Sequence, residues 1–322
     1  MEAGPRLLRD RYGRPATDLR VSVTRRCNFS CVYCHDEGLG PTTRVRDPHE
    51  DEMTPEEIGQ RVRIAREFAI RSVKLTGGEP LVRTDIDRIV ALTVQEVPDV
   101  SMTTNGTLLA RKVDALRGAG LKRLNVSIDT LDPDAFRQIR GGRLGPVLRG
   151  VRRALEAGLV PVKLNVVLFP RTLEHLPALI DFVGGTDGLR LQLIQFMPEQ
   201  ARGDVRPVDL IALKEDLASR ADTILVRPMH HRRIYRIGGA EIEIVDPVGN
   251  EEFCMNCQRV RVTHDGKLKG CLNRDDDLVP TRGLDDEALR EAFRRVVAAR
   301  VPYYGVHVRT SPPPRVTAAG PA

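Results

Sequence analysis

The six cysteines of this 322-residue chain fall into two groups of three, one near each end. The first group is Cys27, Cys31 and Cys34, and the second is Cys254, Cys257 and Cys271. Their spacings are C-x3-C-x2-C and C-x2-C-x13-C. A [4Fe–4S] cluster takes a thiolate on each iron, so three cysteines hold a cluster and leave one iron open. The pattern predicts two metal sites, each with a vacant coordination position.

Disulfides and zinc are the competing interpretations of these cysteines. Disulfides are disfavoured because each group has an odd number of cysteines and because residues 1–14 lack the apolar stretch of a signal peptide. Zinc is the stronger alternative, since C-x2-C is a common half-site. His35 adjoins Cys34 and His264 lies inside the second group, so zinc at the second group stays open.

The composition limits the class of protein. With 41% hydrophobic residues the chain can bury a large core, yet no stretch approaches the roughly 20 apolar residues of a membrane span. Reduced thiols predict a cytoplasmic protein. The net charge of +6 favours an anionic partner, whereas 4% aromatic residues and no Trp argue against stacking on nucleic acid. The sequence does not choose between a monomer and a homodimer.

Short β-rich runs alternate with helical patterns from about residue 19 to residue 200. The predicted strands are Leu19–Val23, Ser72–Thr76, Val100–Thr104, Arg123–Ile128, Val162–Leu168 and Leu189–Phe196. Two helices carry start signals: Thr54 before Pro55 and Glu57, and Asp132 before Pro133. Six strand–helix units in series predict an α/β fold with a parallel sheet, either open or closed into a partial barrel.

The alternation fades after about residue 200. A β-rich run at Ala240–Val245 precedes the second cysteine group, and Asp285–Arg300 has the apolar spacing of an amphipathic helix. The Pro-rich residues from Ser311 onward are typical of a frayed tail. We expect a barrel-like body over residues 1–225 and a smaller extension over residues 226–322.

The chemistry is expected at the carboxyl ends of the predicted strands, where parallel α/β folds bind ligands. The first cysteine group follows the first strand, and the turn 77–80, Gly-Gly-Glu-Pro, follows the second. The two glycines allow close approach of a ligand, and Glu79 is a candidate partner for an ammonium group. Both motifs are predicted to share one rim.

The first cysteine motif, with Tyr33 before its third cysteine, resembles together with the Gly-Gly-Glu-Pro turn the signature of radical S-adenosylmethionine (SAM) enzymes. From about residue 8 to about residue 300 the chain further resembles the GTP 3′,8-cyclase (MoaA) family of molybdenum cofactor biosynthesis. The stretches that carry this resemblance include Thr103-Thr104-Asn105-Gly106, Asn125-Val126-Ser127-Ile128-Asp129 and Phe253-Cys254-x2-Cys257-x-Arg259-x-Arg261.

The resemblance implies a partial (βα)6 TIM-like barrel with a C-terminal extension that carries a second cluster. It implies two [4Fe–4S] clusters and SAM as cofactors, the cluster on Cys27, Cys31 and Cys34 being the one that binds SAM. The residues implied to bind SAM are Tyr33, Gly78, Ser127 and Met197. The cluster on Cys254, Cys257 and Cys271 is implied to face the guanine of GTP. The residues implied to bind GTP are Arg20, Lys74, Thr103, Lys163, Arg259 and Arg261.

The implied activity is that of a lyase that converts GTP to 3′,8-cyclo-7,8-dihydro-GTP. The implied partners are GTP, a one-electron reductant and a downstream enzyme that takes the cyclic product. Arg259 and Arg261 are alternate residues of an extended run after Cys257, so they are expected on one face, where arginine forks suit phosphate oxygens.

Three departures from the family pattern bear on the substrate. Lys74 and Gln192 stand where arginine is common, and Gln195 stands where an acidic residue is common. The chain finishes Ala318-Ala319-Gly320-Pro321-Ala322 rather than in Gly-Gly, and the run from Cys34 to Gly38 resembles archaeal-type members, which also lack that tail. The alternative hypothesis is a relative that acts on another nucleotide or on a peptide.

Overall fold

The computed structural model describes residues 6–34, 51–197 and 206–303. Within these ranges the strands form one 12-stranded sheet in the order β12-β11-β10-β1-β2-β3-β4-β5-β6-β9-β8-β7. The strands are β1 Asp18–Ser22, β2 Ser72–Thr76, β3 Asp99–Thr104, β4 Arg123–Ser127, β5 Val162–Leu168, β6 Leu189–Gln195, β7 Thr223–Val226, β8 Arg233–Ile237, β9 Ala240–Val245, β10 Arg259–Val262, β11 Lys267–Lys269 and β12 Val279–Pro280.

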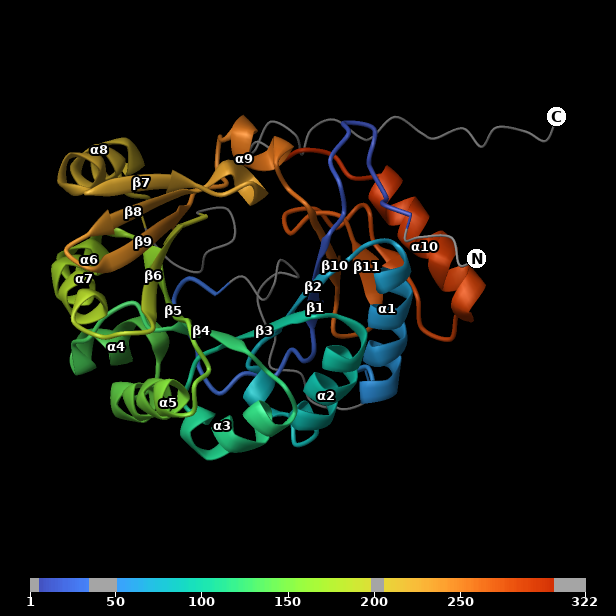
Figure 1. The fold of residues 1–322 in the computed structure, drawn as a ribbon, viewed down its shortest axis with the longest axis horizontal. Coiled ribbons are helices and arrows are strands. Elements are labelled where there is room, and N and C mark those ends of the chain that lie inside the picture. Colours follow the sequence, from blue (N-terminus) through green and yellow to red (C-terminus); the bar gives the residue numbers. More distant parts are fainter. Residues whose placement is uncertain (1–5, 35–50, 198–205, 304–322) are drawn as a thin grey trace.

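Helices cover the outside of this curved sheet (Figure 1). They are α1 Pro55–Glu67, α2 Ile86–Glu96, α3 Leu109–Gly118, α4 Pro133–Arg140, α5 Leu144–Glu156, α6 Pro170–Glu174, α7 Leu176–Gly184, α8 Leu210–Arg220, α9 Glu251–Met255 and α10 Asp286–Ala298, with 3-10 turns η2 Pro80–Val82 and η4 Met229–His231. None of the described helices is both long and apolar enough to cross a membrane.

The predicted fold class is confirmed, because β1 to β6 pair in parallel in chain order and curve into a partial barrel. The predicted second and fifth strands and the run Ala240–Val245 have the bounds of β2, β5 and β9, and the other predicted strands differ by one residue at one or both ends. The predicted helix at Asp285–Arg300 is shorter, because Asp285 is its N-cap and accepts a hydrogen bond from Ala288 N.

Side chains alternate between the two faces of each barrel strand. Leu19 and Val21 of β1 are fully buried in the apolar core, whereas Arg20 lines the barrel interior. In β10, Val260 and Val262 are buried in the same core, and the residues next to them face inward. Parallel sheets covered on both faces usually have near-continuous apolar strands. Here the core lies between sheet and helices, and the interior stays polar.

The two strands that flank the central six come from one short stretch of chain. β9 pairs in parallel with β6, and β10 pairs in parallel with β1 at the opposite side of the sheet. The intervening residues 246–258 therefore cross from one side of the barrel to the other, and they carry α9, Cys254 and Cys257. The predicted boundary at residue 225 falls within β7, and the division into body and extension stays a prediction.

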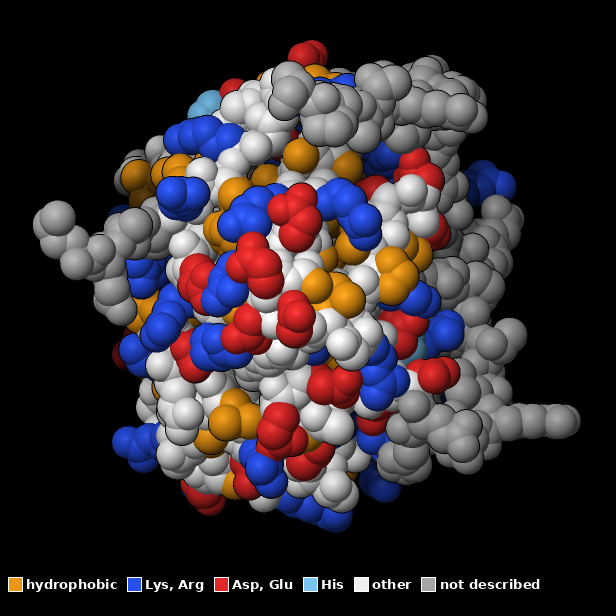
Figure 2. Space-filling view, turned by 90° about the vertical axis from the view of Figure 1, so that its right-hand side faces the viewer, with side chains coloured by type: hydrophobic (Ala, Val, Ile, Leu, Met, Phe, Trp, Pro, Cys, Tyr) orange, Lys and Arg blue, Asp and Glu red, His pale blue; other side chains and the backbone are white. Residues whose placement is uncertain are grey.

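The outer face formed by α1 and α10 mixes acidic and basic side chains (Figure 2). Arg63 pairs with Asp286 at 2.8 Å, and Arg290 pairs with Glu67 at 2.7 Å, so both pairs join the two helices. Exposed pairs of this kind contribute little to stability. The cations predicted to bind the substrate lie in the barrel interior instead.

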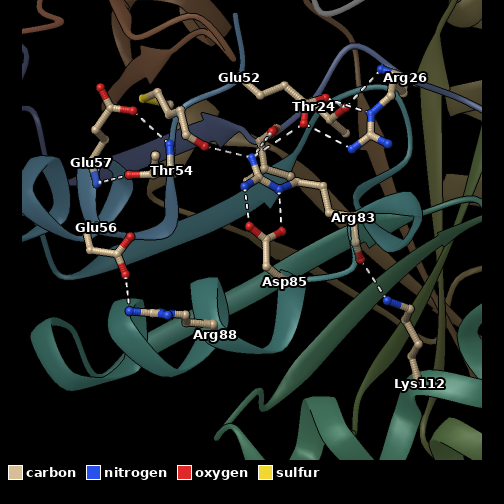
Figure 3. Close-up of polar contacts among 12 residues, drawn as sticks. Thr24, Arg26, Glu52, Thr54, Glu56, Glu57, Arg83, Asp85, Arg88 and Lys112 are labelled. Carbon is tan, nitrogen blue, oxygen red and sulfur yellow. Dashed lines mark hydrogen bonds and ion pairs between the residues drawn. The ribbon is translucent and has the colours of Figure 1, made fainter. Parts of the chain in front are cut away.

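The cap of α1 can be tested by substitution. Thr54 Oγ1 accepts a hydrogen bond from Glu57 N at 3.1 Å, and Glu57 Oε2 accepts one from Thr54 N at 2.8 Å (Figure 3). We expect Thr54→Ala to lower the free energy of unfolding by about 1 kcal/mol in urea titrations, because a helix amide loses its acceptor. The exposed Thr84→Ala is the control, and equal changes in both variants would contradict the cap.

Candidate functional site

Both cysteine groups face one cavity of about 1070 Å³ inside the barrel. The cluster ligands predicted from the sequence all line it: Cys27, Cys31, Cys34, Cys254, Cys257 and Cys271. So do the predicted SAM and GTP residues, namely Tyr33, Gly78, Ser127, Met197, Arg20, Lys74, Thr103, Lys163, Arg259 and Arg261. The fold therefore brings together all the predicted cysteine, SAM and GTP residues, whereas Glu79, the candidate partner for an ammonium group, does not line the cavity.

The Gly-Gly-Glu-Pro turn supports the first cysteine loop through the backbone. Gly78 N donates to Thr24 O at 2.7 Å, and Glu79 N donates to Arg26 O at 2.8 Å. A Cβ on Gly78 would lie 2.3 Å from Arg26 O, so only glycine permits this approach. Glu79 is fully buried and accepts hydrogen bonds from Thr104, Asn105 and Leu81, so its carboxylate supports the turn from within the fold.

An ion-pair network holds the start of the same loop (Figure 3). Both Arg26 Nε and Nη2 donate to Glu52, at 2.9 and 3.0 Å, and Thr24 also donates to Glu52. Arg83 Nη1 donates to Val23 O at 2.8 Å and to Met53 O at 2.9 Å. The network ties the exit of β1 to the start of α1, and thereby fixes where the cysteine loop leaves the barrel.

The predicted SAM residue Tyr33 has its hydroxyl group engaged by the protein. The hydroxyl contacts the carboxylate of Asp129 and the guanidinium of Arg140, and Arg140 Nη1 lies 2.7 Å from Asp129 Oδ2. Burial raises the pKa of Tyr33 well above its ordinary value. Arg140 also offers its carbonyl to the Cys31 thiol, at 3.9 Å. The buried Asp129 and Arg140 thus hold the half-buried Tyr33 through its hydroxyl group, so its ring and backbone are the parts left to contact a cofactor.

The second cysteine group is held where the chain crosses the barrel. Arg14 Nη1 donates to Cys254 O at 2.8 Å, and Arg300 donates to Cys257 O. The ring of Phe253 stacks on that of His230, with centroids 4.0 Å apart and planes 5° apart. Contacts from both ends of the described chain thus fix the position of these thiols.

The donor set fits two iron–sulfur clusters. Each group presents three thiols to the cavity, and Phe29 N donates to Cys27 Sγ at 3.4 Å, a bond that stabilises a cluster thiolate. Burial raises the pKa of Cys31 and of Cys254 to about 12, so both are neutral thiols without metal and release protons on ligation. In the described ranges no three His, Cys, Asp or Glu residues are arranged to hold a single metal ion.

The predicted GTP residues form a cationic wall between the two groups. Arg20 is the register neighbour of Lys74 on one side and of Arg261 on the other. Arg259 Nε donates to Asp18 Oδ1 at 2.8 Å. Burial, together with Arg20 and Arg259, lowers the pKa of Lys74 well below its ordinary value. The neighbouring cations thus disfavour the charged form of Lys74, and an anion bound among them would favour it.

The described residues that depart from the family pattern each make a hydrogen bond inside the protein. Lys74 Nζ donates to Asn125 Oδ1 at 2.9 Å, and Gln192 Nε2 donates to Asn165 Oδ1 at 3.1 Å. Gln195 Oε1 accepts from Val248 N at 2.9 Å, and thereby holds the crossing segment. The remaining departures, the residues after Cys34 and the end of the chain at 318–322, lie outside the described residues.

Among the residues missed in the sequence are Arg227, His230 and Arg232, which line the cavity, and Glu243, which pairs with the lining residue Lys163. The first three belong to the connection between β7 and β8, and Glu243 is a buried carboxylate in β9 that pairs with Lys163, Arg227 and Arg232. Nothing in the sequence distinguishes Glu243, because Glu241 stands in the same run of β9. Burial would raise its pKa, but the three cations outweigh burial and lower it to about 2.

Comparison with known proteins matches two family profiles. The profile of the Radical SAM superfamily covers residues 21–183, and that of Molybdenum Cofactor Synthesis C covers residues 189–306. The chain is similar in fold to SuiB of Streptococcus suis bound to S-adenosylmethionine, with a TM-score of 0.61 and 17% identity over 81% of this chain and 61% of that chain. It is also similar to native anSMEcpe with bound AdoMet, with a TM-score of 0.61 and 16% identity over 87% and 82%.

A cavity lined by the signature cysteines and closed by the Gly-Gly-Glu-Pro turn is the centre of a radical SAM protein, which uses SAM and [4Fe–4S] clusters. Two curated relatives, each named probable GTP 3′,8-cyclase, are 47% identical in Halobacterium salinarum and 44% identical in Methanosarcina mazei. These matches cover 94% and 92% of this chain and 91% and 90% of the relatives. The chain belongs to the GTP 3′,8-cyclase family within the radical SAM superfamily.

The close approach at Gly78 predicts an effect on the first cluster. Gly78→Ala should force the turn away from the cysteine loop, because the added Cβ would lie 2.5 Å from Arg25 O. After anaerobic reconstitution we expect the variant to lose about half of its bound iron, namely one of two four-iron clusters. Gly118→Ala, whose Cβ would have no neighbour within 4 Å, is the matched control. Full iron content in both variants would contradict a supporting role for the turn.

The buried Glu243 predicts a pH-dependent contribution to stability. Because its folded pKa of about 2 lies below the ordinary 4.5, the contribution is present above pH 4.5 and is lost as the pH falls toward 2. Glu243→Gln should lower the free energy of unfolding of the metal-free protein by about 3 kcal/mol at pH 7, with a smaller difference at pH 3. Urea titrations at the two pH values measure this, and a constant difference would contradict it.

Proposed function

We propose that this chain is a radical SAM lyase that converts GTP to 3′,8-cyclo-7,8-dihydro-GTP, in the cytoplasm, as a step of molybdenum cofactor biosynthesis. The observation that carries the proposal is that both cysteine groups face one cavity with a cationic wall between them. The names of the curated relatives support the choice of GTP. The product is then passed to a downstream enzyme, and an external one-electron donor supplies the reducing equivalent.

The two cysteine groups have different tasks in this proposal. Cys27, Cys31 and Cys34 would hold the cluster that binds SAM. When bound, this cluster and SAM would supply the radical chemistry. Cys254, Cys257 and Cys271 would hold the second cluster, which would supply a coordination site for the guanine. We assign the first task to the body over residues 1–225 and the second to the extension over residues 226–322.

The cofactor and the substrate contact different residues of the cavity. The SAM contacts are the backbone of Gly78, which lies close to the first cysteine loop, and the cavity-lining residues Tyr33, Ser127 and Met197. The GTP contacts are Arg20, Lys74, Thr103, Lys163, Arg259 and Arg261. Arginine forks bind phosphate oxygens in pairs, whereas lysine contributes a point charge. These residues bind and orient the nucleotide so that its ribose faces the SAM side.

The test is product analysis with anaerobically reconstituted protein. We expect about eight irons per chain, in two four-iron clusters, and formation of 5′-deoxyadenosine together with the cyclic nucleotide only when GTP is present. Mass spectrometry of the products measures both. Turnover with another nucleotide and none with GTP would overturn the choice of substrate.

Cysteine variants separate the two tasks in the same assay. Cys31→Ser should abolish SAM cleavage, since the first cluster is lost. Cys254→Ser should abolish the cyclic product yet leave some uncoupled SAM cleavage, because the first cluster remains. Complete loss of SAM cleavage in both variants would show that the second cluster does more than seat the substrate.

A further inference from the structure

Three cations converge on one buried carboxylate at the side of the cavity formed by β5 and β9. Glu243 has a side-chain exposure of 3%, and Oε1 lies 3.2 Å from Arg227 Nη1 and 3.3 Å from Arg232 Nη1. Lys163 contacts the other oxygen, Oε2. One negative charge cannot balance three positive charges, so this group keeps a surplus of positive charge, which is shielded from water at Arg232 but not at Arg227, whose side chain is 39% exposed.

Arg232 is the most confined of these cations. Its side chain is 6% exposed, it lines the cavity, and its Nε has no hydrogen-bond partner among the described residues. Burial lowers its pKa to about 10 in spite of Glu243, and Arg259 and Arg227 act in the same direction as burial. Nε itself has almost no exposed surface, so an anion would meet Arg232 through the part of its side chain that lines the cavity.

The connection that carries Arg227 and Arg232 also reaches the second cysteine group. His230 N donates to Asn256 O at 2.9 Å, and the His230 ring stacks on Phe253, the residue before Cys254. The backbone at His230 is left-handed, with φ of 62°, which is uncommon for a residue other than glycine and is retained where the surroundings hold it. The connection is therefore fixed between the second cysteine group and Glu243.

We propose that the β7–β8 connection is a phosphate-binding element of this cavity, in which Arg232 and Arg227 contact the polyphosphate of the nucleotide and Glu243 positions them. The proposal rests on the proposed function, and it extends it to residues that the family pattern did not indicate. One nucleotide would then place its base at the second cysteine group and its phosphate chain near Lys163 and Arg232. Gln192, the register neighbour of Glu243, is neutral where arginine is common in the family. The positive charge next to Glu243 therefore comes from the β7–β8 connection and Lys163.

The alternative is that Arg232 and Glu243 only join β8 to β9. Binding measurements separate the two roles, because a structural ion pair does not distinguish a nucleotide from its nucleoside. The experiment is anaerobic calorimetry on the reconstituted protein with GTP, guanosine and inorganic triphosphate. Arg232→Gln should weaken GTP and triphosphate binding roughly tenfold to a hundredfold, as expected for a charged hydrogen bond, and leave guanosine binding within about twofold.

One further variant controls for folding. Arg236→Gln, in the same strand pair, removes an exposed ion pair with Glu241 at 3.9 Å that lies outside the cavity lining, and it should leave GTP binding within about twofold. In Arg232→Gln itself, Glu243 keeps Lys163 and Arg227 as partners, so the change leaves no buried charge unpaired.

Unchanged binding of GTP and of inorganic triphosphate by Arg232→Gln would overturn the proposal in favour of a structural pair. Equal losses for GTP and guanosine in Arg232→Gln would overturn it as well. Failure of the proposed function is distinguishable, because it appears as no cyclic product from GTP in the wild-type protein. Weaker binding of inorganic triphosphate by Arg232→Gln supports the phosphate site whichever nucleotide proves to be the substrate.

Discussion

The structure depends on the crossing of residues 246–258 from β9 to β10. Since β9 pairs with β6 and β10 pairs with β1, the ends of this segment are fixed at opposite sides of the barrel. The chain between them has to pass over the cavity, and it carries Cys254 and Cys257 with it. The side chains of Arg14 and Arg300 then fix the segment by donating hydrogen bonds to its backbone carbonyl groups. The second metal site is thus a consequence of how the sheet is joined.

The polar interior is tolerated because the apolar core lies elsewhere. Each barrel strand buries one set of side chains against the helices, so the inward set is free to serve the ligand. The cations of that set are held in place by the carboxylates of Asp18 and Glu243, which are themselves buried. Their charges only partly cancel, so the cavity favours an anion and is pre-organised to receive it.

The sequence predicted the positions of the barrel strands because period-2 patterns and helix caps are local signals. It placed Lys163 and Arg259 in the site through the family resemblance, but it gave no indication of their partners Glu243 and Asp18. Arg232 was missed for a related reason. Its connection follows no parallel strand of the central six, and its place at the cavity depends on the pairing of β8 with β9 and of β9 with β6.

The sequence by itself determined the class of chemistry, because thiol spacing within each cysteine group and the Gly-Gly-Glu-Pro turn are set over a few residues. Only the tertiary structure decided that both groups face the same cavity and which charges lie between them. The reason is that convergence of distant segments depends on sheet order and closure, which local patterns do not encode. The charge balance around Glu243 likewise exists only once β5, β9 and the β7–β8 connection are packed together.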